Sequence, residues 1–187
     1  MDMKNKTWII VGVVVIVLAL WVGGTYNSLV TSNEAITTQW AQVETSYQRR
    51  FDLIPNLVES VKGAMAQEKA IFTALAEARS KYSGATSPDQ KAAAASQVES
   101  ALSRLLVVVE NYPQLKSVEV VQGLIAELSG TENRVSIERN RYNEKVQEYN
   151  VRTKRFPGSV VASIFGFGER SYFKADAAAA TAPQVKF

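Results

Sequence analysis

The sequence predicts an all-α protein: an N-terminal transmembrane helix, then an antiparallel bundle of three to four long helices with an irregular C-terminal tail. Three observations predict this class. An uncharged apolar run lies near the N-terminus, apolar residues recur every three or four positions over most of the remainder, and the chain holds only 5 prolines. With 187 residues, the chain is long enough for one domain with a hydrophobic core and too short for two domains of ordinary size.

The apolar run fits a membrane span in length. Residues 8–22 are apolar apart from Gly12. Residues 7–26 supply the roughly 20 positions needed to cross about 30 Å of hydrocarbon. Trp8 and Trp21 stand near the two ends, where interfacial aromatic residues are common. We therefore expect a single-pass anchor at residues 7–26.

A cleaved signal peptide is the main alternative to this anchor. The run is long for such a peptide, and residues 22–24 make only a passable cleavage site.

The orientation in the membrane follows from the basic residues near the span. Lys4 and Lys6 precede the span, and the first basic residue after it is Arg49. The positive-inside rule then predicts a cytoplasmic N-terminus at residues 1–6. We expect the body to lie outside the cytoplasm.

The helical bundle is expected over residues 27–157, and its first part follows one apolar stripe from Leu29 to Tyr82. Pro55 interrupts this stripe because proline cannot donate a helical hydrogen bond. Either the helix kinks there, or Asp52 caps a new helix with Pro55 in its first turn. The unbroken phase of the stripe favours a kink. The stripe comprises Leu29, Ile36, Trp40, Val43, Tyr47, Phe51, Ile54, Val58, Val61, Met65, Phe72, Leu75 and Tyr82.

The second part of the bundle begins after the clearest loop, residues 83–89. A helix is expected over 91–112, and a last long helix should stop at 156–158, where Pro and Gly follow Phe. The tail, 158–187, does not have a helical pattern. The last helix carries a coiled-coil-like series with a spacing of seven. This series is Val121, Leu128, Val135, Tyr142, Tyr149 and Phe156.

The composition excludes several classes of function. The chain contains no Cys and no His, so thiolate nucleophiles, His-based triads, zinc sites and Glu-x-x-His di-iron sites are excluded as normally built. A net charge of +3 is too mild to indicate nucleic-acid binding. No phosphate-binding glycine motif is present, and the Ser-x-x-Lys spelling at 171–174 lacks its companion motifs. We expect no enzyme activity, and no catalytic, cofactor-binding, metal-binding or small-molecule site.

Charged residues interrupt the apolar stripes at two positions. Glu68 lies on the stripe between apolar positions, and Arg79 lies further along it. A charge on a core-facing position needs a partner, which Arg134, Arg139 or Arg141 of the last helix offers. These positions indicate either a buried switch or ion site, or a structural pair that fixes helix register. The structural interpretation is favoured.

The candidate site residues are architectural. Asn143 and Asn150 each follow a tyrosine, seven residues apart, and are expected to tie helices together through their amides rather than to bind a ligand. The expected structural polar network is Arg49, Arg50, Asp52, Glu68, Arg79, Asn143 and Asn150. The expected packing anchors are Trp40, Tyr47, Tyr142 and Tyr149. The expected assembly contacts of the tail are Phe165, Phe167, Tyr172 and Phe173.

Eleven short motifs along the chain, listed at the end of this paragraph, resemble the LemA family in their residues and in their order. The resemblance implies one N-terminal membrane anchor and a body of long antiparallel helices, and it implies no agreed enzymatic activity, substrate or cofactor. Gln67 departs from the family, in which His is frequent there, and this weakens any idea of metal or proton chemistry at Glu68. The motifs that carry the resemblance are residues 26–30, 40–44, 49–59, 78–80, 110–116, 130–134, 141–143, 149–150, 156–157, 165–167 and 172–173.

These observations favour a membrane-anchored, non-enzymatic structural or scaffolding protein that self-assembles as a homo-oligomer. With the resemblance, the expected setting is the bacterial envelope, at the cell membrane of a bacterium with the body in the periplasm. The alternative is an adaptor that binds and regulates another membrane or envelope protein. Residues 139–155 are rich in basic side chains, which indicate a solvated helix face or a surface for phospholipid headgroups or an acidic partner. An enzyme that uses only Glu68 with Asp52 or Glu59 is disfavoured, because their spacing places no matched pair across a cleft.

Overall fold

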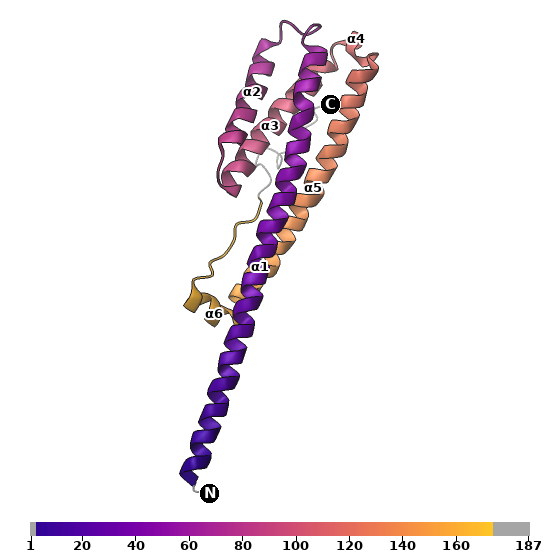
Figure 1. Cartoon of the computed structure of the whole chain (residues 1–187). Coiled ribbons are helices and arrows are strands. Elements are labelled where there is room, and N and C mark those ends of the chain that lie inside the picture. The colour runs from indigo at the N-terminus through magenta and orange to yellow at the C-terminus, as the bar shows by residue number, and fades with distance from the viewer. Residues whose placement is uncertain (1–2, 174–187) are drawn as a thin grey trace, which may run out of the picture. The chain divides into compact units, whose positions relative to one another are not determined.

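The computed structural model describes residues 3–173, and every regular element among them is a helix (Figure 1). The predicted all-α class, with a long apolar N-terminal helix and packed helices after it, is confirmed. The chain divides into two compact units: unit 1 is Met1–Gln39 with Asn143–Tyr172, and unit 2 is Trp40–Tyr142 with Phe173–Phe187. The helices are α1 (Met3–Val61), α2 (Lys69–Gly84), α3 (Pro88–Val109), α4 (Pro113–Lys116), α5 (Glu119–Lys154) and α6 (Gly158–Phe165).

Helix α1 passes through Pro55 without ending. The alternative in which Asp52 caps a new helix is therefore wrong. Ile54 and Leu57 flank the proline and are almost completely buried. Their packing offsets the backbone hydrogen bond that Pro55 cannot donate.

Most positions of the stripe from Leu29 to Tyr82 are buried as expected, but the expectation that they follow one continuous helix is wrong, because the chain turns back after Val61. Residues 62–67 form turns, Glu68 precedes the next helix, and α2 begins at Lys69. Val61 and Met65 are both fully buried at this turn. The apolar spacing persists across the turn because both flanking helices bury a face in the same core, so periodicity alone does not reveal the break.

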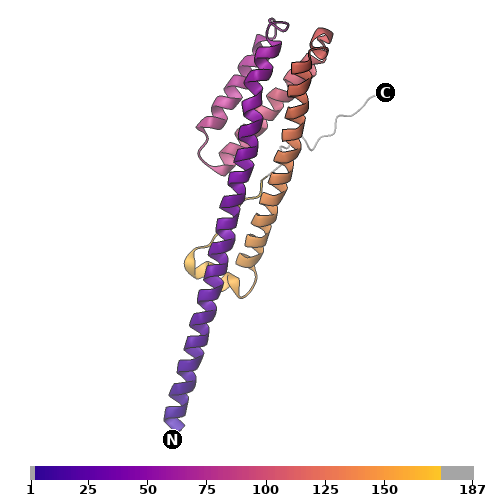
Figure 2. The same cartoon turned by 45° about the vertical axis from the view of Figure 1, so that its right-hand side comes forward.

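Unit 2 is a bundle of α2, α3 and the parts of α1 and α5 that belong to it. Figures 1 and 2 both show α2 and α3 side by side next to this part of α1, with α5 antiparallel to α1. A loop lies where one was expected, but it is shorter than 83–89: only residues 85–87 separate α2 from α3, because Ser87 caps α3 through a capping box with Gln90. The helix expected over 91–112 accordingly begins earlier and ends earlier, as Pro88–Val109. The core of this unit includes Val43, Tyr47, Leu57, Leu75, Val98, Leu102, Leu105 and Val135, each at most 1% exposed.

The coiled-coil-like series in α5 has the expected inward face, with one exception. Its first five members are buried, from Val121 to Tyr149. Phe156 is 80% exposed. The reason is that α5 ends at Lys154, so the seven-residue register no longer fixes the direction of a side chain two residues further on.

Unit 1 contains a short helix in the segment expected to be irregular. Helix α6 occupies Gly158–Phe165, and the unstructured start of the tail is therefore a wrong expectation. Val161 and Ala162 of α6 pack on Leu29 of α1, and this burial stabilises a helix too short to form alone. Gly166 ends α6 at a φ of 74°. The remaining tail, residues 174–187, lies outside the described residues.

Two helices in the described part of the chain are long and apolar enough to cross a membrane, α1 from Trp8 onward and α3. They differ in burial: the most apolar window of α1 has no buried residue, whereas 39% of the window in α3 is buried. Val98 and Leu102 of α3 belong to the core of unit 2. The segment at the start of α1 is therefore the candidate for a single membrane span.

Candidate functional site

Three helices of unit 2 meet at the side chain of Arg139. The Arg139 Nε donates a hydrogen bond of 2.8 Å to the Tyr47 hydroxyl, and its guanidinium forms an ion pair with Glu99. The guanidinium also lies 4.5 Å from the ring centre of Phe173. Tyr47, Glu99 and Arg139 come from α1, α3 and α5 respectively. This group fixes the register of the three helices through one cation.

The surroundings of Tyr47, Arg139 and the neighbouring Tyr82 raise the pKa of all three side chains. Burial, and next the Glu99 carboxylate, raise the pKa of Tyr47, although Arg139 opposes the shift. Burial disfavours the charged form of Arg139, but Glu99 and Tyr47 outweigh it and raise the pKa of the guanidinium. Burial, and then Glu44, raise the pKa of Tyr82 to about 12. These groups hold their protons at neutral pH, which suits a structural role better than proton transfer.

Stability should therefore fall in alkaline solution as the buried tyrosines ionise. Tyr82 has a pKa of about 12 in the folded chain against an ordinary 10.0, so the folded state holds this proton to higher pH than the unfolded state. Its contribution is complete below about pH 10 and is lost as the pH rises towards 12. Unfolding by denaturant across this range should give a steep decline that Tyr82→Phe makes shallower. Equal slopes for the two chains would contradict the prediction.

The aromatic side chains predicted as packing anchors in unit 2 lie in its core. Tyr47 is fully buried, and Trp40 packs against Tyr142 with ring centres 5.3 Å apart. Phe173 stacks on Trp40 at 6.5 Å. Phe173 was expected to be an assembly contact, and the structure places it on Trp40 and Arg139 of its own chain.

The predicted polar network of unit 2 is dispersed. Arg50 is buried, forms an ion pair with Glu132 and donates to the carbonyl of Leu128 at 3.4 Å. Asp52 accepts a hydrogen bond of 2.7 Å from Gln48 on the exposed side of α1. Arg49 is exposed. The structure does not bring these three side chains into one cluster.

The two charges expected on the stripe also lie apart. Glu68 is the N-cap residue of α2 and accepts a hydrogen bond from the Tyr112 hydroxyl at 3.4 Å. Arg79 is half-buried within α2. The expected pairing of Glu68 with an arginine of the last helix is not present, because the turn before α2 removes Glu68 from the helical stripe.

Arg139 pairs with Glu99 and not with Glu68. The sequence analysis did not predict Glu99 as its partner. The position of Arg139, four residues after buried Val135, was the available signal.

In unit 1, Asn150 binds the backbone of the segment after α6. Its side chain donates to the Arg170 carbonyl and accepts from the Arg170 N–H, both at 2.9 Å. Tyr149 donates to the carbonyl of Gly168 at 3.0 Å, and burial raises the pKa of this tyrosine. Asn143, the other predicted amide, is half-buried in α5. Asn150 and Tyr149 thus hold the returning chain against α5.

Replacing Asn150 by Ala should release this segment. The substitution removes both hydrogen bonds to Arg170, and Asn150 is only 4% exposed, so the expected loss in stability is about 1–3 kcal/mol. Trypsin should then cleave after Arg170 faster than in the parent chain. Asn140→Ala, at an exposed position of the same helix, should leave the cleavage rate unchanged. Equal rates for both variants would show that the amide does not hold the segment.

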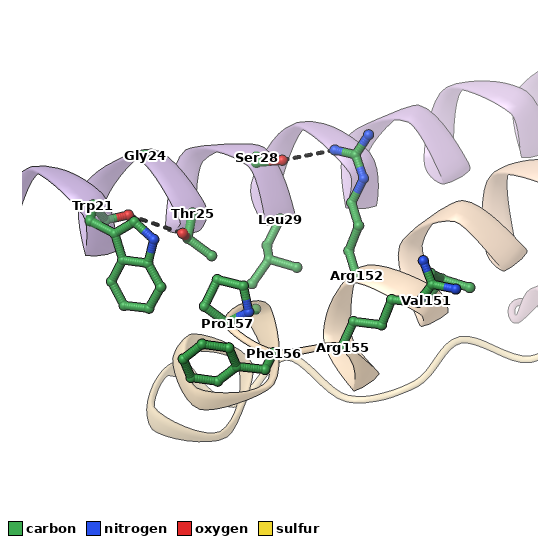
Figure 3. Close-up of a pocket in the computed structure, with 11 residues that line it drawn as sticks. Trp21, Gly24, Thr25, Ser28, Leu29, Val151, Arg152, Arg155, Phe156 and Pro157 are labelled. Atoms are coloured by element: carbon green, nitrogen blue, oxygen red, sulfur yellow. Dashed lines mark hydrogen bonds between the residues drawn. The ribbon is translucent and has the colours of Figure 1, made fainter.

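An open groove lies in unit 1 where α1 faces the end of α5 and the start of α6 (Figure 3). Its volume is about 530 Å³. Arg152 closes one side by donating to the hydroxyls of Ser28 and Ser32, each at 2.8 Å. Phe156 lies on the other side, with its ring centre 6.4 Å from that of Trp21. The groove therefore combines an aromatic wall with a cationic one.

The aromatic residues after α5 pack partly on α1. The rings of Phe165 and Phe167 approach Tyr26, with centre distances of 4.9 and 5.5 Å. Tyr172 is exposed. Much apolar surface remains open around these contacts. The exposed fractions are 80% for Phe156, 69% for Ile164, 51% for Phe165 and 45% for Val160.

The described residues contain no group of three metal-ligating side chains, and the whole sequence contains neither His nor Cys. The fold and these clusters define a membrane-associated helical-bundle protein with one candidate span. A family model, described as the LemA family, matches residues 39–187, and the chain belongs to that family.

The chain is also similar to curated magnetosome proteins of two bacteria. It is 27% identical over 175 residues to the magnetosome proteins MamQ 1 and MamQ 2 of Paramagnetospirillum magneticum, covering 80% of this chain and 64% of each relative. It is 26% identical over 174 residues to the magnetosome protein MamQ of Magnetospirillum gryphiswaldense, covering 79% of this chain and 64% of that protein. The chain thus spans less than two thirds of the length of these relatives.

Proposed function

We propose that this protein is a single-pass, non-enzymatic scaffold of the bacterial envelope that self-assembles into a homo-oligomer. The observation that carries the proposal is the apolar segment of α1, whose most apolar window has no buried residue. Side chains of this kind, exposed over a length of about 20 residues, are stable in lipid and not in water. The same helix then supplies Val43 and Tyr47 to the core of unit 2.

The orientation in the proposal follows from charge. Lys4 and Lys6 precede the apolar segment, and Arg49 is the first basic residue after it. The proposed N-terminus is therefore cytoplasmic and the bundle periplasmic. The relatives described above are bacterial proteins, which supports a bacterial envelope as the setting.

The non-enzymatic part of the proposal is supported by the available side chains. Without His or Cys, acid–base chemistry would depend on carboxylates, Lys or Tyr. Burial raises the pKa of Tyr47 and Tyr82 away from neutral pH, and Glu99 is engaged by Arg139. A structural role needs no proton transfer by these side chains.

An adaptor function is the second candidate, and one surface favours it. A groove of about 600 Å³ in unit 2 is lined from α1 and α5, and it includes Arg49, Arg134 and Arg141. Glu138 also lines the groove and pairs with Arg141 at 2.8 Å, so Arg49 and Arg134 are the cations that suit an acidic segment of another envelope protein.

The mass of the full-length protein in mild detergent distinguishes the two candidates. Light scattering with negative-stain images should give a large, regular particle if the protein is a scaffold. A monomer or dimer would contradict self-assembly and favour the adaptor. Deleting residues 158–187 should reduce the particle size if the tail mediates assembly, and an unchanged size would contradict that role for the tail.

A further inference from the structure

We propose that α6 and Phe156 lie in the headgroup layer of the same bilayer that the apolar segment of α1 spans. Unit 1 would then contact the membrane in two ways, through a span and through an interfacial helix beside its end. This inference rests on the membrane span in the proposed function and is independent of self-assembly. Four observations within unit 1 carry it.

The first observation is the level at which α6 packs on α1. A span that begins at residue 7 reaches the far side of about 30 Å of hydrocarbon after about 20 residues, near Tyr26. The ring of Phe165 packs on Tyr26 at 4.9 Å, and that of Phe156 faces Trp21 at 6.4 Å. The aromatic residues around α6 are therefore placed where the span leaves the hydrocarbon, the depth that Trp and Tyr prefer in membrane proteins.

The second observation is the composition of α6. None of its residues is charged, and its buried side, Val161 and Ala162, accounts for only part of its apolar surface. Val160 and Ile164 are four residues apart on an open side of the helix and are 45% and 69% exposed. Phe156, just before α6, is 80% exposed. An apolar patch of this kind requires a partner surface.

The third observation is the cationic border of the patch. Arg152 and Arg155 line the groove beside Phe156 and Pro157 (Figure 3). Arg155 is exposed and forms no ion pair with another residue in the described part of the chain. Arginines that border an apolar surface suit the phosphate groups of lipids, which lie just outside the hydrocarbon. Glu169, which follows α6, forms an ion pair with Lys154 at 2.9 Å.

The fourth observation identifies the occupant as lipid. The patch is continuous with the candidate span, because Val22 is partly buried against the cluster that Leu29 forms with α6. Any bilayer that surrounds residues up to Val22 must meet the neighbouring apolar surface of α6. A second copy of the chain would need to displace that lipid first, so lipid is the better-supported occupant and a second copy becomes an outcome of the test.

The absence of native Cys makes a direct test possible in the full-length chain. Ile164→Cys would be labelled with the fluorophore NBD and reconstituted in vesicles of phosphatidylcholine and phosphatidylglycerol. Lipids with nitroxides at the headgroup or along the acyl chain then report the depth of the label by quenching. Val120→Cys is the matched control, since Val120 is also exposed and lies in unit 2. Leu18→Cys reports the span, and circular dichroism checks that each labelled chain is folded.

The label at position 164 should be quenched most by shallow nitroxides, at roughly 5–10 Å below the headgroup boundary. The label at position 18 should be quenched by deep nitroxides, and that at position 120 by neither. If position 164 behaves like position 120 while position 18 is deep, the inference is wrong and the span stands. Blue-shifted emission at position 164 without lipid quenching would indicate a second copy and also contradict the inference. If position 18 is not quenched, the span itself is wrong, and the inference fails with it.

Discussion

Replacing Tyr47 with Ala should lower the free energy of unfolding by about 3–5 kcal/mol, the range for removing a large buried aromatic side chain. Tyr47 is 0% exposed and packs against Phe51 and Tyr82, with ring centres 5.5 and 5.8 Å away. Its hydroxyl also accepts a hydrogen bond from Arg139. The substitution therefore leaves a cavity between α1 and α2 and removes one partner of a partly buried cation. The measurement is unfolding by denaturant in mild detergent, followed by circular dichroism.

Two variants separate the contributions of Tyr47. Tyr47→Phe keeps the ring and removes the hydroxyl, and it should cost about 1–3 kcal/mol because Arg139 still pairs with Glu99. Tyr172→Ala removes an exposed tyrosine and should change stability by about 0.5 kcal/mol or less. If Tyr47→Ala were no more destabilising than Tyr172→Ala, Tyr47 would not be a packing anchor.

Replacing Gly158 with Ala should displace α6. A Cβ built on Gly158 would overlap the backbone oxygen of Arg152 and lie 3.3 Å from its carbonyl carbon. Backbone atoms of α5 cannot rotate away from this contact as a flexible side chain would. The expected cost is about 1–3 kcal/mol or more, the range for overpacking a tight site. Since the turn connects α5 to α6, the strain should loosen the contact of Val161 and Ala162 with Leu29.

Hydrogen exchange of the backbone amides in α6 measures this effect, which should appear as faster exchange than in the parent chain. Gly123→Ala is the matched control, because Gly123 lies within α5 and a Cβ there meets nothing within 4 Å. That variant should be stabilised by roughly 0.5–1 kcal/mol through the better helix propensity of Ala. Unchanged exchange in Gly158→Ala would contradict a tight turn at this position.

The sequence predicted the parts of this fold that depend on local patterns. The buried positions of α5 from Val121 to Tyr149 follow from a spacing of seven, and the loop before α3 follows from Ser87 and its neighbours. The candidate span follows from length and the absence of charge. Each of these depends on residues close together in the chain, so no knowledge of neighbouring helices was needed.

Partners distant in sequence were harder to predict. Arg139 lies 40 residues from Glu99 and 92 from Tyr47, and Glu68 lies 44 from Tyr112. Which charged side chains meet depends on where the chain reverses direction between helices. The turn at residues 62–67 places Glu68 beside Tyr112 and away from the arginines of α5. A charged residue on an apolar stripe therefore predicts that a partner exists, but not which residue it is.

By itself, the sequence determined the helical class, the candidate span, the place of the loop before α3 and the heptad face of α5, because periodicity and turn chemistry are local. Tertiary structure alone decided that the chain turns back after Val61, that Arg139 joins Tyr47 to Glu99, and that residues 158–165 form a helix against Leu29. The physical reason is burial. A helix as short as α6 is unstable alone, and the apolar surface it shares with α1 provides the free energy that orders it.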